Sequence, residues 1–157
     1  MPDLIVGTNT YVTLDTADAH FDARLHADSW NAASDDDKTK ALLMAAVMLD
    51  RFIRWNGSKA FPDQPLEWPR IGISWIPAGS VPLSVRAAQM ELALVLLSRD
   101  TTALPETAGM KSIQADTLKI EVAPSDRVKT IPDHIMDMVR AYGSRPGGLR
   151  SIELARA

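Results

Sequence analysis

The chain has 157 residues, contains no cysteine and carries a formal net charge of −3 at pH 7. This length suits one domain, which can bury enough surface to fold without a metal or a disulfide. The lack of cysteine excludes disulfides, thiolate metal sites and a cysteine nucleophile. With 46% hydrophobic and 24% charged residues, the composition is typical of a soluble globular protein.

The charge is unevenly distributed along the chain. Residues 1–110 carry fourteen acids and nine bases, whereas residues 111–157 carry six acids and eight bases. Proteins dedicated to duplex DNA usually show a clear basic stripe, and none is visible in this sequence. The beginning of the chain lacks the features of a signal peptide, and residues 92–97 form the longest apolar run, so we expect no membrane association.

Two helices are predicted in the first third of the chain. The first spans about residues 14–26 with Thr13 as N-cap, and Leu25 belongs to its predicted apolar face. The second spans about residues 35–55, where Ser34 and Asp37 form an aspartate version of the capping box. Apolar residues then recur at helical spacing until Gly57, which we expect to end this helix.

Two more helices are predicted further along the chain, each opened by a proline. Pro82 suits the first turn of a helix that ends near Arg99, with an apolar face from Val85 to Leu96. Pro132 opens the last helix, which we expect Gly143 to close. Between these helices, residues 112–115 and 118–122 alternate apolar and polar side chains and predict a β-hairpin.

The segment between Gly57 and Pro82 is unusual because it combines prolines with large apolar residues. Its prolines exclude a helix, and its tryptophans and isoleucines argue against disorder. We therefore predict an extended arm that packs against another surface. Trp68 and Trp75 should either lie at a subunit contact or clamp the arm onto the helices.

The sequence as a whole predicts a mainly α fold. We expect a small bundle of about four helices with the hairpin at about residues 111–122 and the long proline-rich extended arm. Residues 1–143 would form this domain, and residues 144–157 an extended C-terminal tail that reaches another protein. Pro146, Gly147 and Gly148 should prevent the last helix from resuming.

The residues indicate neither catalysis nor a bound cofactor or metal. His20, His26 and His134 do not form a catalytic arrangement with a nucleophile, so we expect no enzyme activity. Asp35, Asp36 and Asp37 lack the spacing of a calcium loop and suit the first turn of a helix instead. The predictions are therefore that catalytic, cofactor and metal sites are all absent.

Several short motifs follow one another in an order that indicates a family. The chain opens with Asn-Thr-Tyr-Val-Thr-Leu at 9–14, and Arg-Phe-Ile-Arg-Trp-Asn-Gly follows at 51–57. Pro-Leu-Glu-Trp-Pro-Arg at 65–70 is the most specific string, and Val-Arg-Ala-Ala-Gln stands at 85–89. Over about residues 9–142, this pattern resembles a family of tailed-phage proteins labelled DnaT-like single-stranded-DNA-binding.

By architecture, the same family resembles the head-tail adaptors of long-tailed phages. The resemblance implies a small helical bundle that assembles into a ring, typically of about twelve subunits, below the portal protein. Its partners would be the portal, neighbouring copies of the same chain and the next neck or tail-connector protein. DNA would pass through the lumen without specific binding. The protein would reside in the virion neck after assembly in the host cytoplasm.

Two functions compete at this point. The first is a structural virion protein that forms the adaptor ring, joins head to tail and extends the DNA channel. The second is a single-stranded-DNA-binding protein of phage replication, in which Trp55, Trp68 and Trp75 would stack on bases. That function needs a basic groove, whereas the tryptophans could equally pack inside the bundle or against a subunit.

If the protein is an adaptor, ten residues are candidates for its contacts with other subunits. Five lie in the arm, and five lie in the basic tail, where the arginines could anchor the subunit to an acidic partner or could simply be solvated. The candidates for the contact with the portal or a neighbouring subunit are Trp68, Pro69, Arg70, Ile73, Trp75, Arg145, Arg150, Ile152, Leu154 and Arg156.

Overall fold

A computed structural model of the chain describes residues 2–103, 112–115, 118–121 and 129–146. Within these ranges the fold is mainly α, as predicted, with five helices and short antiparallel strand pairs. The helices are α1 (Leu14–Asp22), α2 (Asp28–Asn31), α3 (Asp35–Phe52), α4 (Leu83–Ser98) and α5 (Asp133–Val139). The strands are β1 (Arg54–Trp55), β2 (Ser58–Lys59), β3 (Arg70–Ile71), β4 (Ser112–Ala115), β5 (Leu118–Glu121) and β6 (Gly143–Ser144).

The predicted helix starts are confirmed by their caps. The Thr13 side chain accepts a hydrogen bond from the Thr16 amide at the start of α1. Ser34 accepts from the Asp37 amide, which is the first half of the predicted box at the start of α3. The Asp37 carboxylate accepts from the Ser34 hydroxyl, whereas in a full capping box it would accept from the Ser34 amide. Each cap satisfies an amide that the helix itself leaves without a partner.

The first predicted helix is wrong in its length. It ends at Asp22 instead of residue 26, and a separate short helix, α2, follows. The chain turns between them, where His26 has a φ of 59°. This turn brings Trp30 back onto Phe21, with ring centroids 4.5 Å apart in the core. Leu25, predicted on the buried face, consequently lies in the turn and is 83% exposed.

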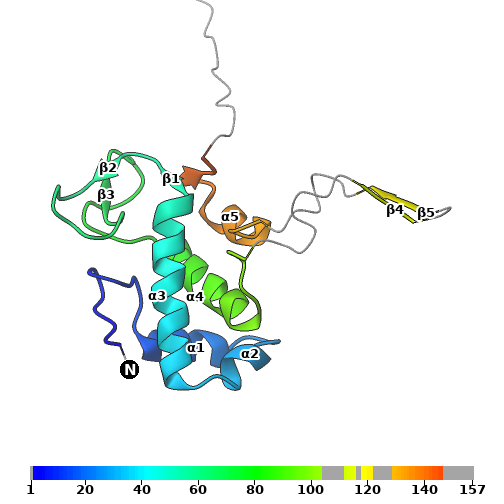
Figure 1. Cartoon of the computed structure of the whole chain (residues 1–157). Coiled ribbons are helices and arrows are strands. Elements are labelled where there is room, and N and C mark those ends of the chain that lie inside the picture. The colour runs from blue at the N-terminus through cyan, green and yellow to red at the C-terminus, as the bar shows by residue number, and fades with distance from the viewer. Residues whose placement is uncertain (1, 104–111, 116–117, 122–128, 147–157) are drawn as a thin grey trace, which may run out of the picture.

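Helices α3 and α4 pack along each other at the centre of the molecule (Figure 1). The predicted apolar face of α4 is confirmed at Val85, Ala88 and Leu92, which are fully buried. Helix α5 packs against α4, whereas α1 and α2 lie near the beginning of α3. The core therefore lies between the two long helices and is closed by the three shorter ones.

A buried glutamine, which the apolar periodicity does not reveal, ties the N-terminal segment to both long helices. Gln89 on α4 is 0% exposed. Its amide nitrogen donates to the Thr10 hydroxyl and to the carbonyl of Leu42 on α3, while its oxygen accepts from the Tyr11 amide. Because every bond is buried, removal of this side chain would leave several polar groups without partners.

Two predicted boundaries, the end of the second helix and the start of the C-terminal tail, differ from the structure because the chain forms a strand pair at both places. Helix α3 ends at Phe52, and Arg54–Trp55 of β1 then pair with Gly143–Ser144 of β6. The last helix ends at Val139, so Gly143 is a strand residue and not its stop. A Cβ on Gly143 would lie 2.7 Å from Ile53 Cγ2, which explains a glycine at this close approach.

The proline-rich segment is not an extended arm in this structure. Strand β2 pairs with β3, and the residues between them fold into a compact loop (Figure 1). Gly57 permits the turn before β2, because its φ is 70° and an added Cβ would lie 2.2 Å from the carbonyl oxygen of Ile71. The loop therefore folds back onto its own domain.

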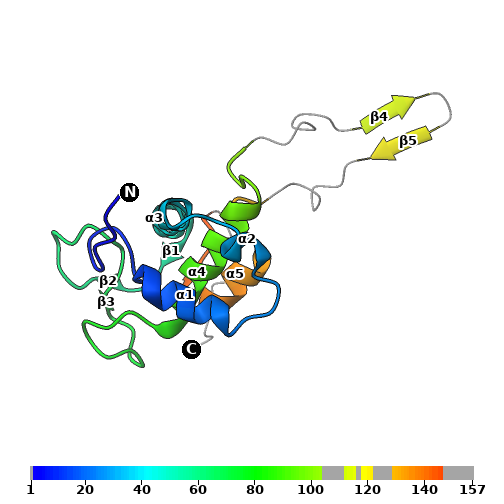
Figure 2. The ribbon, with the colours of Figure 1, turned by 90° about the horizontal axis from the view of Figure 1, so that it is seen from below.

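The predicted β-hairpin is confirmed by the pairing of β4 with β5, in which Ile113 lies opposite Ile120 and Ala115 opposite Leu118. Val122, the last residue of the predicted hairpin, lies outside the described residues. Figures 1 and 2, which are turned by 90° relative to each other, both show the hairpin apart from the helices.

Candidate protein-docking surfaces

The described histidines do not form a catalytic arrangement. His20 Nε2 lies 2.9 Å from a carboxylate oxygen of Glu91, whose other oxygen pairs with Arg24 at 2.9 Å. This ion-pair cluster links α1 to α4. His26 and His134 are exposed. Within residues 2–103, 112–115, 118–121 and 129–146, acidic, histidine and cysteine side chains nowhere gather in threes around a possible metal position.

Across the same described ranges, no helix combines the length and the apolar character that a membrane span requires.

Trp68 and Ile73, two of the predicted interface residues, are buried inside their own domain. Trp68 is 1% exposed, and its ring packs edge-on against Trp55 and Tyr142, with centroid distances of 5.6 and 5.9 Å. Ile73 is 8% exposed. Of the two roles predicted for Trp68, the structure therefore contains the internal one, in which the tryptophan holds the loop on the helices.

Arg70 is likewise turned inward, although arginine is seldom buried. Only 7% of its side chain is exposed, and its guanidinium lies 2.6 Å from the Glu67 carboxylate. It also donates to the carbonyl oxygens of Asn56 and Gly57 at 2.7 and 2.8 Å. Arg70 thus joins both ends of the loop, while its neighbour Pro69 is partly buried.

Trp75 differs from Trp68, because 66% of its surface is exposed. Two other large apolar residues also face solvent, namely Phe61 in the β2–β3 loop, which is 63% exposed, and Leu83 at the start of α4, which is 80% exposed. Monomeric soluble proteins rarely expose extended apolar patches without a partner. Trp75 is therefore the one predicted arm residue that remains well placed for an intermolecular contact.

Of the five interface residues predicted near the C-terminus, the structure describes only Arg145. Arg145 Nη2 donates to the Ile131 carbonyl and to the Asp133 carboxylate, both at 2.7 Å, so it is bound to its own domain. The predicted tail can begin no earlier than Pro146. Arg150, Ile152, Leu154 and Arg156 lie outside the described residues.

A buried carboxylate joins the loop to the N-terminal segment. The Tyr11 hydroxyl donates to one oxygen of Asp50 on α3, and the Glu67 amide donates to the other at 3.0 Å. Burial raises the pKa of Asp50 to about 6, although both hydrogen bonds act in the opposite direction. Burial and the Asp50 carboxylate together raise the pKa of Tyr11, so the hydroxyl keeps its proton.

The raised pKa of Asp50 leads to a prediction about stability and pH. Between about pH 6 and pH 4 the folded protein binds a proton at Asp50 that the unfolded chain does not. The contribution of this group therefore becomes more favourable as the pH falls, by up to about 3 kcal/mol for a shift of about two pKa units. Urea unfolding of the wild type and Asp50→Asn at pH 7 and pH 4.5 should show this gain in the wild type only. An equal pH response of both proteins would contradict the assignment.

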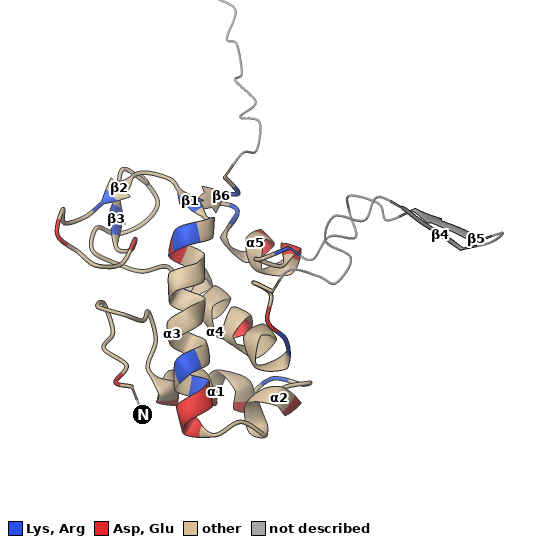
Figure 3. Ribbon diagram, in the orientation of Figure 1, with Lys and Arg blue, Asp and Glu red and all other residues tan. Residues whose placement is uncertain are grey.

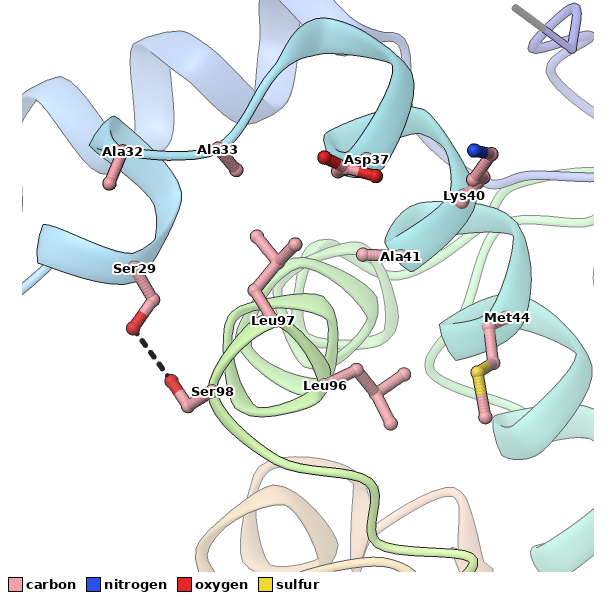
Figure 4. A pocket seen from close by; sticks show the side chains of 10 residues that line it. All are labelled: Ser29, Ala32, Ala33, Asp37, Lys40, Ala41, Met44, Leu96, Leu97 and Ser98. Atoms are coloured by element: carbon pink, nitrogen blue, oxygen red, sulfur yellow. Dashed lines mark hydrogen bonds between the residues drawn. The ribbon is translucent and has the colours of Figure 1, made fainter.

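An open cleft of about 780 Å³ lies where α2, α3 and the end of α4 meet (Figure 4). Leu96 and Leu97 reach into it from α4, and Met44 faces it from α3. Leu96 was predicted to belong to the buried face of α4, but it is only partly buried at the edge of this cleft. The remaining walls come from Ser29, Ala32, Ala33, Asp37, Lys40, Ala41 and Ser98. The cleft lining is thus about half apolar and half polar, with small residues on the α2 side.

The two ends of α3 differ in charge (Figure 3). Residues 13–41, around its beginning, contain seven acids and three bases. All three bases are ion-paired, namely Arg24 with Glu91, Lys38 with Asp18 and Lys40 with Asp36.

At the opposite end, the exposed arginines are Arg51, Arg54 and Arg140. Arg140 belongs to this end because the Asn56 amide donates to the nearby Tyr142 carbonyl at 2.8 Å. Back at the acidic end, Asp35–Asp37 lie in the first turn of α3, as predicted, where their negative charge interacts favourably with the positive end of the helix dipole. The molecule therefore has an acidic end and, opposite it, an end where exposed arginines stand among a similar number of acids.

The sequence profile of the family described as "Putative DnaT-like ssDNA binding protein" matches residues 3–157. The chain belongs to this family. Neither the curated proteins nor the solved structures include a significant match to it. The family label agrees with the resemblance noted from the motifs at 9–14, 51–57 and 65–70.

Proposed function

We propose that this family member is a structural protein of a tailed-phage virion, a head-tail adaptor that forms a ring on the portal protein. The observation that carries this proposal is the charge polarity along α3, with paired bases among seven acids at one end and exposed arginines at the other. An adaptor has to present chemically different surfaces to the portal above it and the tail protein below it.

Further support comes from exposed apolar residues on different parts of the molecule. Met44 and Val47 on α3 are 40% and 60% exposed, while Trp75 lies in the loop before α4. The contacts of a closed ring are heterologous, so each subunit needs two different surfaces for its two neighbours. The arginines of residues 147–157 add a basic segment that could meet an acidic partner.

Single-stranded-DNA binding is the second candidate function, and the exposed arginines near the end of α3 favour it together with the family label. Exposed arginines can contact phosphates, and the exposed Trp75 and Phe61 could stack on bases. Two features favour the adaptor. The net charge is −3, and Trp55 and Trp68 are buried against each other, so they offer no face to a base.

The test is assembly with the portal protein encoded by the same genome. We expect the two purified proteins to co-sediment, and electron micrographs to show a second ring below the portal. The same preparation should bind an oligothymidylate weakly in fluorescence anisotropy, with the binding lost at physiological ionic strength. Failure to bind the portal, together with tight binding to the oligonucleotide, would replace the adaptor by the DNA-binding function.

A further inference from the structure

One side of helix α3 faces outward and carries a stripe of exposed side chains. Five residues at helical spacing form this α3 stripe: Asp37, Lys40, Met44, Val47 and Arg51. All five are exposed, with Met44 at 40% and Val47 at 60%. Figure 2 shows α3 end-on at the edge of the group of helices. Within the described part of the chain, the stripe is left uncovered.

The centre of the α3 stripe is apolar, and hollows lie beside it. Met44 borders the cleft between α2, α3 and α4, where Leu96 of α4 adds a partly buried apolar side chain (Figure 4). A second hollow of about 440 Å³ lies beside Val47, with Leu43 and Leu66 among its lining residues. Exposed apolar surface of this extent is typical of a site that another protein covers.

The two ends of the α3 stripe carry opposite charges at equal distances from its centre. Asp37 precedes Met44 by seven residues, and Arg51 follows it by seven. Seven residues make about two helical turns, so the three side chains lie nearly in line, and each charge is about 10 Å from Met44 along the axis. The stripe is therefore complementary to a second copy of itself that runs in the opposite direction.

We propose that two copies of this chain form a twofold dimer through antiparallel packing of their α3 stripes. With Met44 of both copies at the twofold axis, Asp37 of each copy lies opposite Arg51 of the other, so the contact contains two ion pairs. Val47 of one copy then lies beside Ala41 of the other, at the wall of the cleft. The apolar centres of the two stripes cover each other.

The charges favour the antiparallel direction over a parallel one. Parallel stripes would place Asp37 against Asp37 and Arg51 against Arg51, and like charges at a contact cost free energy. Lys40 does not oppose the antiparallel contact, because its ammonium group pairs with Asp36 on the same helix. A second copy supplies both complementary charges by symmetry alone.

This dimer goes beyond the proposed adaptor function. It joins two free subunits by an isologous contact, whereas a closed ring requires heterologous contacts. The dimer covers Met44 and Val47, which are also candidates for contacts in the ring. Dimer and ring would therefore exclude each other, and subunits would separate before they assemble on the portal.

Charge exchange in the full-length protein tests the antiparallel pairing. Arg51→Glu would set a carboxylate against Asp37 at both ends of the contact, and Asp37→Arg would set two guanidinium groups against each other. We expect each variant alone to weaken the dimer at least about tenfold in sedimentation equilibrium. A mixture of the two variants should regain dimerisation to within a few-fold of the wild type, because one natural and one reversed ion pair then form.

Asp22→Arg and Arg86→Glu are the matched controls for the charge exchange. Both residues are exposed on other helices, and their substitution changes the net charge by the same amounts. These variants should dimerise like the wild type, alone and mixed. A monomeric wild type, unchanged dimerisation of Arg51→Glu, or a mixture of the stripe variants that associates no better than its components would overturn the proposal.

Disulfide trapping tests the register without any change of charge at the centre, since the natural chain has no cysteine. At the twofold axis, Met44→Cys should cross-link to itself under mild oxidation. Arg51→Cys is the control on the same helix, because its two thiols would lie about 20 Å apart along the helix axis. We expect several-fold more disulfide-linked dimer from position 44 than from position 51. Equal amounts from both positions would contradict the register.

These experiments use the protein alone, so they separate the dimer from the adaptor function. If the stripe variants behave as expected and the wild type fails to bind the portal, the dimer stands and the adaptor function is wrong. If the wild type binds the portal but does not respond to the charge exchange, the adaptor function stands and the dimer is wrong.

Discussion

Trp68→Ala is expected to lower the free energy of unfolding by about 3–5 kcal/mol, the cost of removing a large aromatic side chain from a packed core. Trp68 is 1% exposed and contacts two other aromatic rings, Trp55 on β1 and Tyr142 next to β6. Its loss would therefore loosen the loop and the β1–β6 pair together. Urea denaturation followed by circular dichroism at 222 nm measures the change.

Trp75→Ala is the matched control for this prediction. Trp75 lies in the next loop, between β3 and α4, and is 66% exposed, so its removal should change the stability of the isolated protein by no more than about 0.5 kcal/mol. Trp68→Phe should lower the free energy of unfolding less than Trp68→Ala does. The phenylalanine keeps an aromatic ring in the core and removes an indole N–H that is buried without a hydrogen-bond partner. Equal losses from Trp68→Ala and Trp75→Ala would show that the loop is not held as the structure indicates.

Arg70→Met is expected to lower the free energy of unfolding by about 2–3 kcal/mol, because charge-assisted hydrogen bonds to two carbonyl oxygens are lost together with the ion pair to the partly exposed Glu67. The methionine would fill much of the space but would leave Glu67 without its closest cation. The carbonyl oxygens of Asn56 and Gly57 would also lose their charged donor. Lysine should not restore the loss, because an ammonium group cannot reproduce the planar fork of the guanidinium.

The comparison for Arg70→Met is Arg54→Met, at an exposed position of β1. A surface arginine contributes little to folding, so this control should remain within about 0.5 kcal/mol of the wild type. Chemical denaturation of both variants at pH 7 gives the difference directly. If Arg70→Met were as stable as Arg54→Met, the buried network would not hold the two ends of the loop.

The sequence by itself determined those features that arise from neighbouring residues. Thr13 and Ser34 mark helix starts because capping depends on the side chain and the amides of the next turn. Pro82 marks the start of α4 for another local reason, the fixed φ of its ring. The hairpin register follows from alternation over eight residues. The family was also recognisable, since short motifs keep their order along the chain whatever their environment.

Tertiary structure alone decided where the chain turns inward. No local pattern predicts that Gly143 lies beside Trp55, which is 88 positions away along the chain. Likewise, no local pattern predicts that α3 ends two residues before β1 begins. Proline density excludes a helix between residues 57 and 82 but cannot distinguish an extended arm from a folded loop. That choice depended on the contacts of Trp68 with a buried aromatic cluster and on the hydrogen bonds of Arg70 to the carbonyl oxygens of Asn56 and Gly57. These contacts form between groups that come together only when the chain folds. For this reason Trp68 and Arg70, predicted at an interface, are buried inside their own domain.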